Sequence, residues 1–193
     1  MSATTPALRA RGTRLLIPIL IGGLLAGTFD EMAAFVSMGW NVPRVVAAGL
    51  VGAWAIKSTS AGVWVLGVVL HFVVAFGAAT VYCLASRRLP FLKEHWLVCG
   101  MFFGIAVFLT MYLVVMPLCA FHYAGPYTLR TLLQGIVVHM VLIGLPIGLS
   151  LWWWGSSRTG IRDQKAGIEE IKRMGCVAEG ERVRDSGRDR TGF

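Results

Sequence analysis

The sequence predicts an all-α polytopic membrane protein, a bundle of four transmembrane helices, and three observations carry this prediction. Apolar residues make up 56% of the 193 residues and charged residues only 15%, whereas soluble domains usually carry about a quarter charged residues. Four apolar runs are each long enough to cross a hydrocarbon core, which takes about 20 helical residues. The basic residues stand at the ends of these runs, as membrane topology requires.

The four runs define the transmembrane domain, residues 15–155. Backbone groups inside hydrocarbon must bond to one another, so each run should be a helix. Pro117 and Pro146 should bend the third and fourth helices. We expect the spans at about 15–37, 61–85, 96–120 and 131–154.

A shorter apolar stretch from Val45 to Ile56 joins the first two spans. At about a dozen residues it is too short to cross the membrane. Asn41 is a candidate N-cap, and Pro43 suits a first helical turn. We therefore expect a short helix that lies on the outer face or re-enters the membrane there.

The distribution of Lys and Arg predicts the orientation. Three precede the first span, three lie between the second and third spans, and nine follow the fourth, against Arg44, Lys57 and Arg130 on the opposite side. Basic loops stay in the cytoplasm. We expect residues 1–14 to be a cytoplasmic N-terminal segment and residues 156–193 a charged cytoplasmic tail that is mostly disordered.

Composition also narrows the function. The net charge of +8 follows membrane topology and forms no basic stripe with exposed aromatic residues, so nucleic acid is not an expected partner. Walker, GxGxxG, GxSxG and HExxH motifs are absent from the sequence, which favours a non-enzymatic protein. The expected partners are the lipid bilayer and other membrane-protein subunits or a second copy of the chain.

Glycines predict how the helices pack. Gly23 and Gly27 form a GxxxG step in the first helix, as do Gly100 and Gly104 in the third, and such steps let membrane helices approach closely. In the second and fourth helices a glycine precedes a histidine by four residues, so both lie on one helical face. These pairs are Gly67 with His71 and Gly135 with His139. The shared glycine patterns indicate that the first and second helices and the third and fourth helices form two similar hairpins.

Ionisable residues inside the membrane are costly and mark candidate sites. His71 lies ten residues from the outer end of its helix, about 15 Å at ~1.5 Å per residue. His139 and Asp30 lie about 12 Å and 10 Å deep by the same rise. One layer is therefore expected to contain Asp30, Glu31, His71, His139, Thr110 and Tyr112.

Three interpretations of this layer stay open. A carboxylate paired with histidine can simply join helices. Histidine also exchanges protons near neutral pH, so the layer can handle protons or ions. In the third interpretation His71 and His139 bind haem or a divalent metal, although HxxxH and ExxH spacings do not occur.

The chain resembles the YagU-like group of small bacterial inner-membrane proteins. The resemblance rests on Gly67 to Arg88 (GVVLHFVVAFGAATVYCLASRR), Leu-Pro-Phe-Leu at 89–92, Met116-Pro117-Leu118, Gly135 to His139 and, more loosely, Trp40 to Arg44. It implies a multi-pass inner-membrane protein of a group without an established biochemical activity. It also implies intramembrane histidines at His71 and His139. The third helix of such proteins can carry another histidine, but here Thr110, Met111 and Tyr112 stand in that region, which argues against a three-histidine metal site.

These observations lead to one expectation and one alternative. We expect a non-enzymatic accessory subunit or a small-solute or proton-linked component of the inner membrane, without a cofactor. The alternative is a metal- or haem-binding redox membrane protein that uses His71 and His139.

Overall fold

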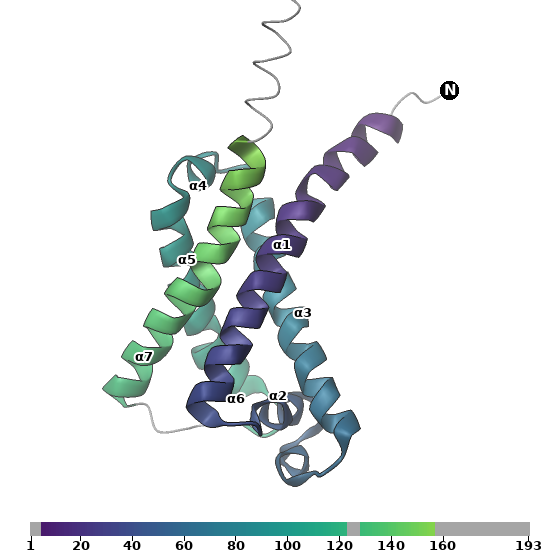
Figure 1. Cartoon of the computed structure of the whole chain (residues 1–193), viewed down its shortest axis with the longest axis vertical. Coiled ribbons are helices and arrows are strands. Elements are labelled where there is room, and N and C mark those ends of the chain that lie inside the picture. The colour runs from purple at the N-terminus through teal and green to yellow at the C-terminus, as the bar shows by residue number, and fades with distance from the viewer. Residues whose placement is uncertain (1–4, 123–127, 157–193) are drawn as a thin grey trace, which may run out of the picture. The chain divides into compact units, whose positions relative to one another are not determined.

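The computed structural model describes residues 5–122 and 128–156. Every regular element among these residues is a helix, and four helices are long and apolar enough to cross a membrane (Figure 1). The prediction of an all-α protein with four helices long and apolar enough to span a membrane is confirmed. The four spans are Leu15–Met38, Ala61–Ala85, Trp96–Leu118 and Leu129–Ser156. The tail after residue 156, with its predicted disorder, lies outside the described residues.

The first helix, α1 (Thr5–Met38), begins well before the membrane span. The predicted segment 1–14 is therefore helical from Thr5 onward. The helix ends at Met38, and the next residue, Gly39, has a φ of +80°, a left-handed conformation that glycine adopts without strain. The Gly39 N–H donates to the carbonyl of Phe35 at 2.9 Å, which satisfies one of the last carbonyls of the helix.

The short connecting helix differs from its prediction in two respects. It is divided into α2 (Val42–Val51) and the 3₁₀ helix η1 (Ala53–Lys57), because Gly52 between them has a φ of +97°. Asn41 stands at the N-cap but makes no capping bond. Its side chain instead accepts a hydrogen bond from Arg44 Nη1 and donates one to the carbonyl of Ile56.

Helix α2 is fixed to two other parts of the bundle. A Cβ atom on Gly67 of the second span would overlap the backbone of Pro43, so the two helices are in backbone contact there. The N–H of Ala120, just after the third span, donates to the carbonyl of Gly49 at 2.8 Å. Ala47 and Ala48 of α2 are fully buried, on the face of the helix that packs against the bundle.

The second span, α3 (Ala61–Ala85), leads through the short helix α4 (Phe91–Glu94) into the third. Tyr82 near the end of α3 is buried, and its hydroxyl donates to the carbonyl of Leu92 at 3.1 Å. Its ring lies 4.9 Å from that of Phe103. Tyr82 is thus a central contact of the core at the α4 end.

The third and fourth spans each contain a π-helical turn two residues before a proline. The third consists of α5 (Trp96–Thr110), the π turn η2 (Met111–Val115) and α6 (Met116–Leu118). The fourth consists of α7 (Leu129–His139), the π turn η3 (Met140–Gly144) and a further α-helical stretch to residue 156. Proline removes a donor and crowds the carbonyl four residues earlier. Those carbonyls lie in the middle of the two π turns, which accounts for the wider turns.

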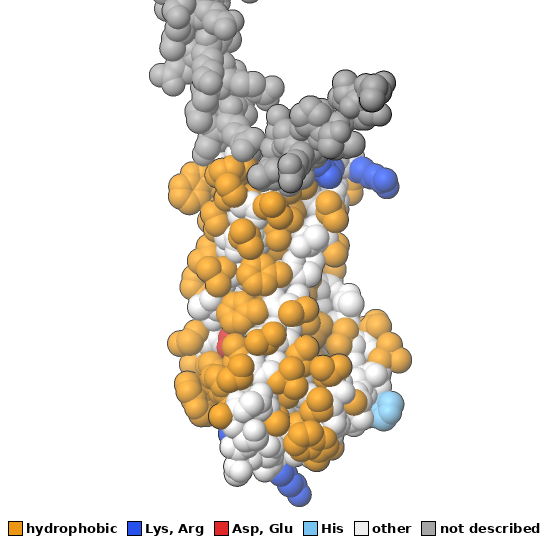
Figure 2. Space-filling model, turned by 90° about the vertical axis from the view of Figure 1, so that its right-hand side faces the viewer, with side chains coloured by type: hydrophobic (Ala, Val, Ile, Leu, Met, Phe, Trp, Pro, Cys, Tyr) orange, Lys and Arg blue, Asp and Glu red, His pale blue; other side chains and the backbone are white. Residues whose placement is uncertain are grey.

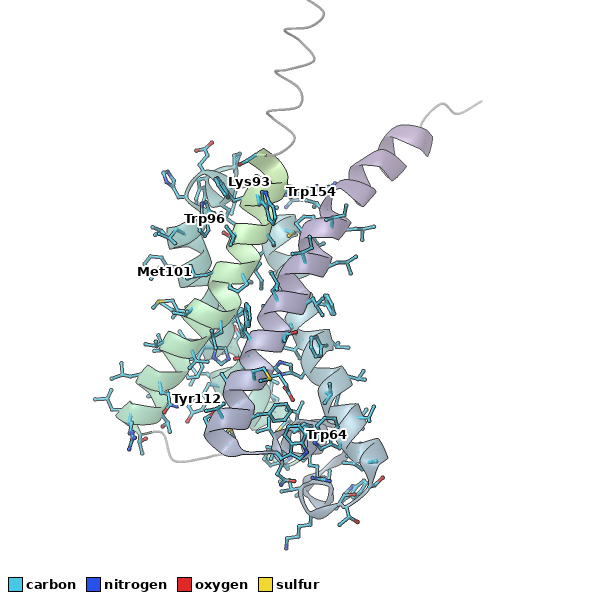
Figure 3. All side chains as sticks on the ribbon, viewed as in Figure 1. Trp64, Lys93, Trp96, Met101, Tyr112 and Trp154 are labelled. Atoms are coloured by element: carbon cyan, nitrogen blue, oxygen red, sulfur yellow. The ribbon has the colours of Figure 1, made fainter. Side chains whose placement is uncertain are left out.

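The spans form two helical hairpins, α1 with α3 and α5 with α7. Ser150 joins them, since its hydroxyl donates to the carbonyl of Pro18 in α1 at 3.1 Å. Apolar side chains cover the outward faces between the two ends, as Figure 2 shows for one side. Trp96 and Trp154 lie at the α4 end and Trp64 near the opposite end (Figure 3), as expected for aromatic residues at membrane interfaces.

Candidate functional site

The candidate site lies where helices α1 and α3 are in close contact. A Cβ atom on Gly23 would overlap the ring of Phe76, and one on Gly27 would crowd Phe72 and Ala75. The two glycines therefore let α3 approach the α1 backbone closely, as a GxxxG step is expected to do. This approach brings a side chain of α3 within reach of α1 main-chain atoms.

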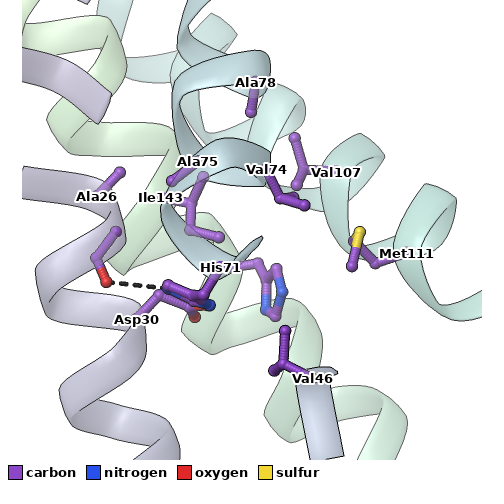
Figure 4. A pocket seen from close by; sticks show the side chains of 12 residues that line it. Ala26, Asp30, Val46, His71, Val74, Ala75, Ala78, Val107, Met111 and Ile143 are labelled. Carbon is purple, nitrogen blue, oxygen red and sulfur yellow. Dashed lines mark hydrogen bonds and ion pairs between the residues drawn. The ribbon is translucent and has the colours of Figure 1, made fainter. Parts of the chain in front are cut away.

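His71 of α3 makes three contacts with α1. Its Nε2 lies 3.0 Å from the carbonyl oxygen of Gly27 and 3.9 Å from Asp30 Oδ2. Its Nδ1 lies 3.2 Å from Glu31 Oε2. Figure 4 shows the ring beside Asp30, with the dashed hydrogen bond running to α1. The structure thus brings Asp30, Glu31 and His71 together.

The contacts of His71 bear on where hydrogen atoms lie in this cluster. The Gly27 carbonyl can only accept, so His71 Nε2 carries a hydrogen and donates it. Without a further proton, the Glu31 carboxylate would face the lone pair of Nδ1 at 3.2 Å. One proton, on Glu31 or on Nδ1, would remove this repulsion and leave the Glu31–His71 pair with zero net charge.

Glu31 is the most enclosed member of the cluster. The residue is 5% exposed, and neither of its carboxyl oxygens has an aligned hydrogen bond from the described residues. The contact with His71 Nδ1 is therefore a close ion-pair distance and not an aligned hydrogen bond. An incompletely bonded buried carboxyl is costly to stability. Such a residue inside a membrane span is a default candidate for function.

His139 of α7 has a different environment. Its Nδ1 lies 3.0 Å from the carbonyl of Gly135, one turn earlier in the same helix. Nδ1 therefore carries the hydrogen in the neutral ring, and Nε2 has the lone pair. The ring of Phe108 lies 5.1 Å from His139 edge-on and occupies the space that a Cβ atom on Gly135 would take. Gly135 thus serves the packing of an aromatic ring against the histidine.

A cavity of about 90 Å³ connects the two histidines. Asp30, His71 and His139 all line it, although the histidines bond to different carbonyls, those of Gly27 and Gly135. One water needs about 10–15 Å³ of such space, so the cavity has room for several. Its remaining lining residues are Ala26, Gly27, Val46, Val74, Ala75, Ala78, Val107, Met111 and Ile143.

Thr110 and Tyr112 do not belong to the cavity lining. The Thr110 side chain is exposed and donates back to the carbonyl of Ala106 in its own helix. Tyr112 stacks on Phe108 at 5.2 Å. Met111, between them in the sequence, lines the cavity instead. Thr110 and Tyr112 were predicted from depth alone, but successive residues of a helix face different sides, and the side chain that lines the cavity is that of Met111.

Glycines hold the second hairpin together as they do the first. A Cβ atom on Gly100 would meet the carbonyl oxygen of Gly144 at 2.7 Å, and one on Gly104 would overlap the backbone of His139 and Met140. His139 is therefore positioned by direct contact between the backbones of α5 and the fourth span. Gly144 and Gly148 form a GxxxG step in the fourth span that was not among the predicted packing glycines.

The histidine contacts bear on metal binding. Metal ligation requires a ring-nitrogen lone pair, and both nitrogens of His71 already face groups of α1. Among the described residues, no three His, Cys, Asp or Glu side chains are placed to hold a metal ion. The cavity is also well below the ~300 Å³ at which pockets for drug-sized ligands begin.

No protein-family model, curated protein or solved structure matches this chain.

Proposed function

We propose that this chain is a non-enzymatic, multi-pass protein of the bacterial inner membrane that binds and releases protons inside its helix bundle. The contact of His71 with Glu31 at 3.2 Å, beside Asp30 and a cavity, carries this proposal. The Glu31–His71 pair holds a proton whose two positions differ by a short transfer. Histidine exchanges protons near neutral pH in ordinary surroundings, and clusters of this kind mark proton relays in membrane proteins.

In this function the cavity is the path between the paired proton and the second hairpin. Asp30 and His139 both line it, and waters in a cavity of about 90 Å³ can connect them. Asp30 accepts the proton from the pair, and His139 Nε2 is an acceptor on the α7 side. With such a relay, the chain would act in small-solute or proton-linked transport and not as an enzyme.

Orientation and family membership belong to the same proposal. The Lys and Arg distribution supports cytoplasmic termini and places α2 on the outer face. Membership of the YagU-like group is proposed from the sequence resemblance alone, at 67–92, 116–118, 135–139 and, more loosely, 40–44.

Proton flux into vesicles tests the function. The purified protein is reconstituted in vesicles with an internal pH dye, and a potassium gradient with valinomycin sets the membrane potential. We expect the Glu31→Gln, His71→Ala double variant to lower the flux at least tenfold. The Glu94→Gln, His95→Ala variant makes the same chemical changes at exposed positions of the α4 end and should match the unmodified protein. Equal flux in both double variants would refute the proposal.

A further inference from the structure

The cavity at His71 and His139 has the size of a very small ligand. Its volume of about 90 Å³ exceeds the ~10–15 Å³ that one water needs. It is smaller than the ~150 Å³ engineered cavity that admits benzene. A ligand of a few non-hydrogen atoms therefore fits, and a drug-sized molecule does not.

The polar groups of the cavity select a hydrogen-bond donor. His71 Nε2–H is already donated to Gly27, and His139 Nδ1–H to Gly135. The polar atoms of the lining side chains that remain available to a ligand are acceptors: the Asp30 carboxylate and the lone pair of His139 Nε2. Anions and acceptor-only molecules gain no hydrogen bond in such a site, whereas a group with several N–H bonds does.

The charge of the site selects a cation. Asp30 is the carboxylate among the lining residues, and they include no lysine or arginine. Three elements contribute ionisable groups to the cavity: Asp30 from α1, His71 from α3 and His139 from α7. The other elements contribute apolar side chains: Val46 from α2, Val107 from α5, Met111 from η2 and Ile143 from η3. A buried negative charge is most stable with an opposite charge beside it.

The apolar walls distinguish between cations. Sodium and potassium need a shell of several oxygen atoms, and Asp30 is the only carboxylate among the residues that line this cavity. A primary ammonium group needs few acceptors, and its alkyl part can contact Val46, Val107 and Ile143. Burial of apolar surface then adds to the affinity.

We propose that the cavity binds ammonium or a short primary alkylammonium ion, with its N–H groups on Asp30 and His139. The inference rests on the proposed function, because Asp30 and His139, which accept the proton there, also hold the cation. A protonated amine that passes its proton to Asp30 or His139 leaves as the neutral amine, so charge and proton balance without another reactant.

Binding is measured on the full chain in detergent micelles, where a proton gradient cannot form. Isothermal titration uses methylammonium chloride, ammonium chloride, sodium chloride and tetramethylammonium chloride as separate probes. We expect methylammonium or ammonium to bind at least tenfold more tightly than tetramethylammonium, which has the same charge but no N–H, and than sodium. Equal affinity for all the cations would overturn the inference.

Two variants test the location. Asp30→Asn should weaken methylammonium binding at least tenfold. Val46→Phe fills the cavity from α2 and should weaken it equally, whereas Leu50→Phe on the exposed side of the same helix should not. Unchanged binding in a folded Asp30→Asn or Val46→Phe variant would overturn the inference.

Vesicle flux in amine-free buffer separates the two proposals. Proton flux without methylammonium binding contradicts the amine site and leaves the proton function standing. Methylammonium binding without proton flux contradicts the proton function and leaves the amine site standing.

Discussion

The imidazole of His71 lies 3.2 Å from the carboxylate of Glu31, and this contact joins the first two membrane spans. A second bond from the same ring reaches the carbonyl of Gly27. One side chain of α3 thereby engages both a side chain and the backbone of α1. Its removal should affect stability as well as proton transfer.

A double-mutant cycle should show strong coupling between Glu31 and His71. Glu31→Gln or His71→Asn alone leaves the partner buried without its match, at a cost of about 1–3 kcal/mol. The double variant should be less destabilised than the sum of the two single variants. Thermal unfolding in detergent, followed by circular dichroism, measures all four proteins.

Thermal unfolding in detergent also compares how much Asp30 and Glu31 each contribute to stability. Asp30→Ala should lower the melting temperature, but less than Glu31→Ala, because Asp30 lies 3.9 Å from the ring and is more exposed. A pair at exposed positions, Glu94 and His95, serves as the uncoupled reference. Additive effects of Glu31 and His71 would contradict the pairing.

Gly144→Ala should destabilise the second hairpin. The added Cβ atom would overlap the carbonyl of Gly100, so the backbones of α5 and the fourth span must separate. Overpacking of this kind costs about 1–3 kcal/mol. Melting in detergent provides the measurement.

Gly77→Ala is the matched control. Nothing lies within 4 Å of a Cβ atom at Gly77, and alanine is favoured over glycine in a helix by up to about 1 kcal/mol. A melting temperature equal to or above that of the unmodified protein is expected. Equal losses in the two variants would show that the close approach at Gly100 does not exist.

Pro146→Ala should alter the fourth span without unfolding it. The new N–H can bond to the carbonyl of Leu142, in the middle of η3, and favours an ordinary α-helical turn. The residues before and after this turn then change their relative rotation, so His139 and Ser150 cannot both keep their contacts. We expect at least a fivefold lower proton flux at unchanged helix content. Pro90→Ala, outside the spans, should leave the flux unchanged; a loss in both variants, or in neither, would contradict this role of the turn.

Thiol labelling in intact cells should report the orientation. The variants start from a chain in which Cys83, Cys99, Cys119 and Cys176 are replaced by serine or alanine. A membrane-impermeant maleimide should label Thr59→Cys, between η1 and α3, without lysis. Arg88→Cys, between α3 and α4, should react only after permeabilisation. The reverse pattern would place the termini outside.

Much of the fold follows directly from the sequence because hydrocarbon imposes a length on each helix. The predicted second span, 61–85, coincides with α3, and the others differ by a few residues at their ends. The break at Gly52 and the two π turns were not predicted. A left-handed glycine depends on the path that the chain must take afterwards, and π turns depend on how proline is accommodated in a packed helix.

The candidate site was predictable in depth but not in rotation. Rise per residue placed Asp30, Glu31, His71 and His139 in one layer, and their contacts with each other or with a shared cavity follow that placement. Thr110 and Tyr112 share the depth but lie outside the cavity lining, where Met111 takes their place. The bond from His71 to the Gly27 carbonyl was also missed, since a sequence pattern identifies side chains and not exposed backbone acceptors.

Helix α2 lies against one hairpin at Gly67 and is hydrogen-bonded, through Gly49, to the residue that follows the third span. It therefore acts as a tie between the hairpins at one end of the bundle. The Ser150–Pro18 hydrogen bond is a second connection between the hairpins, nearer the α4 end. The two connections together limit separation of the hairpins on both sides of the cavity.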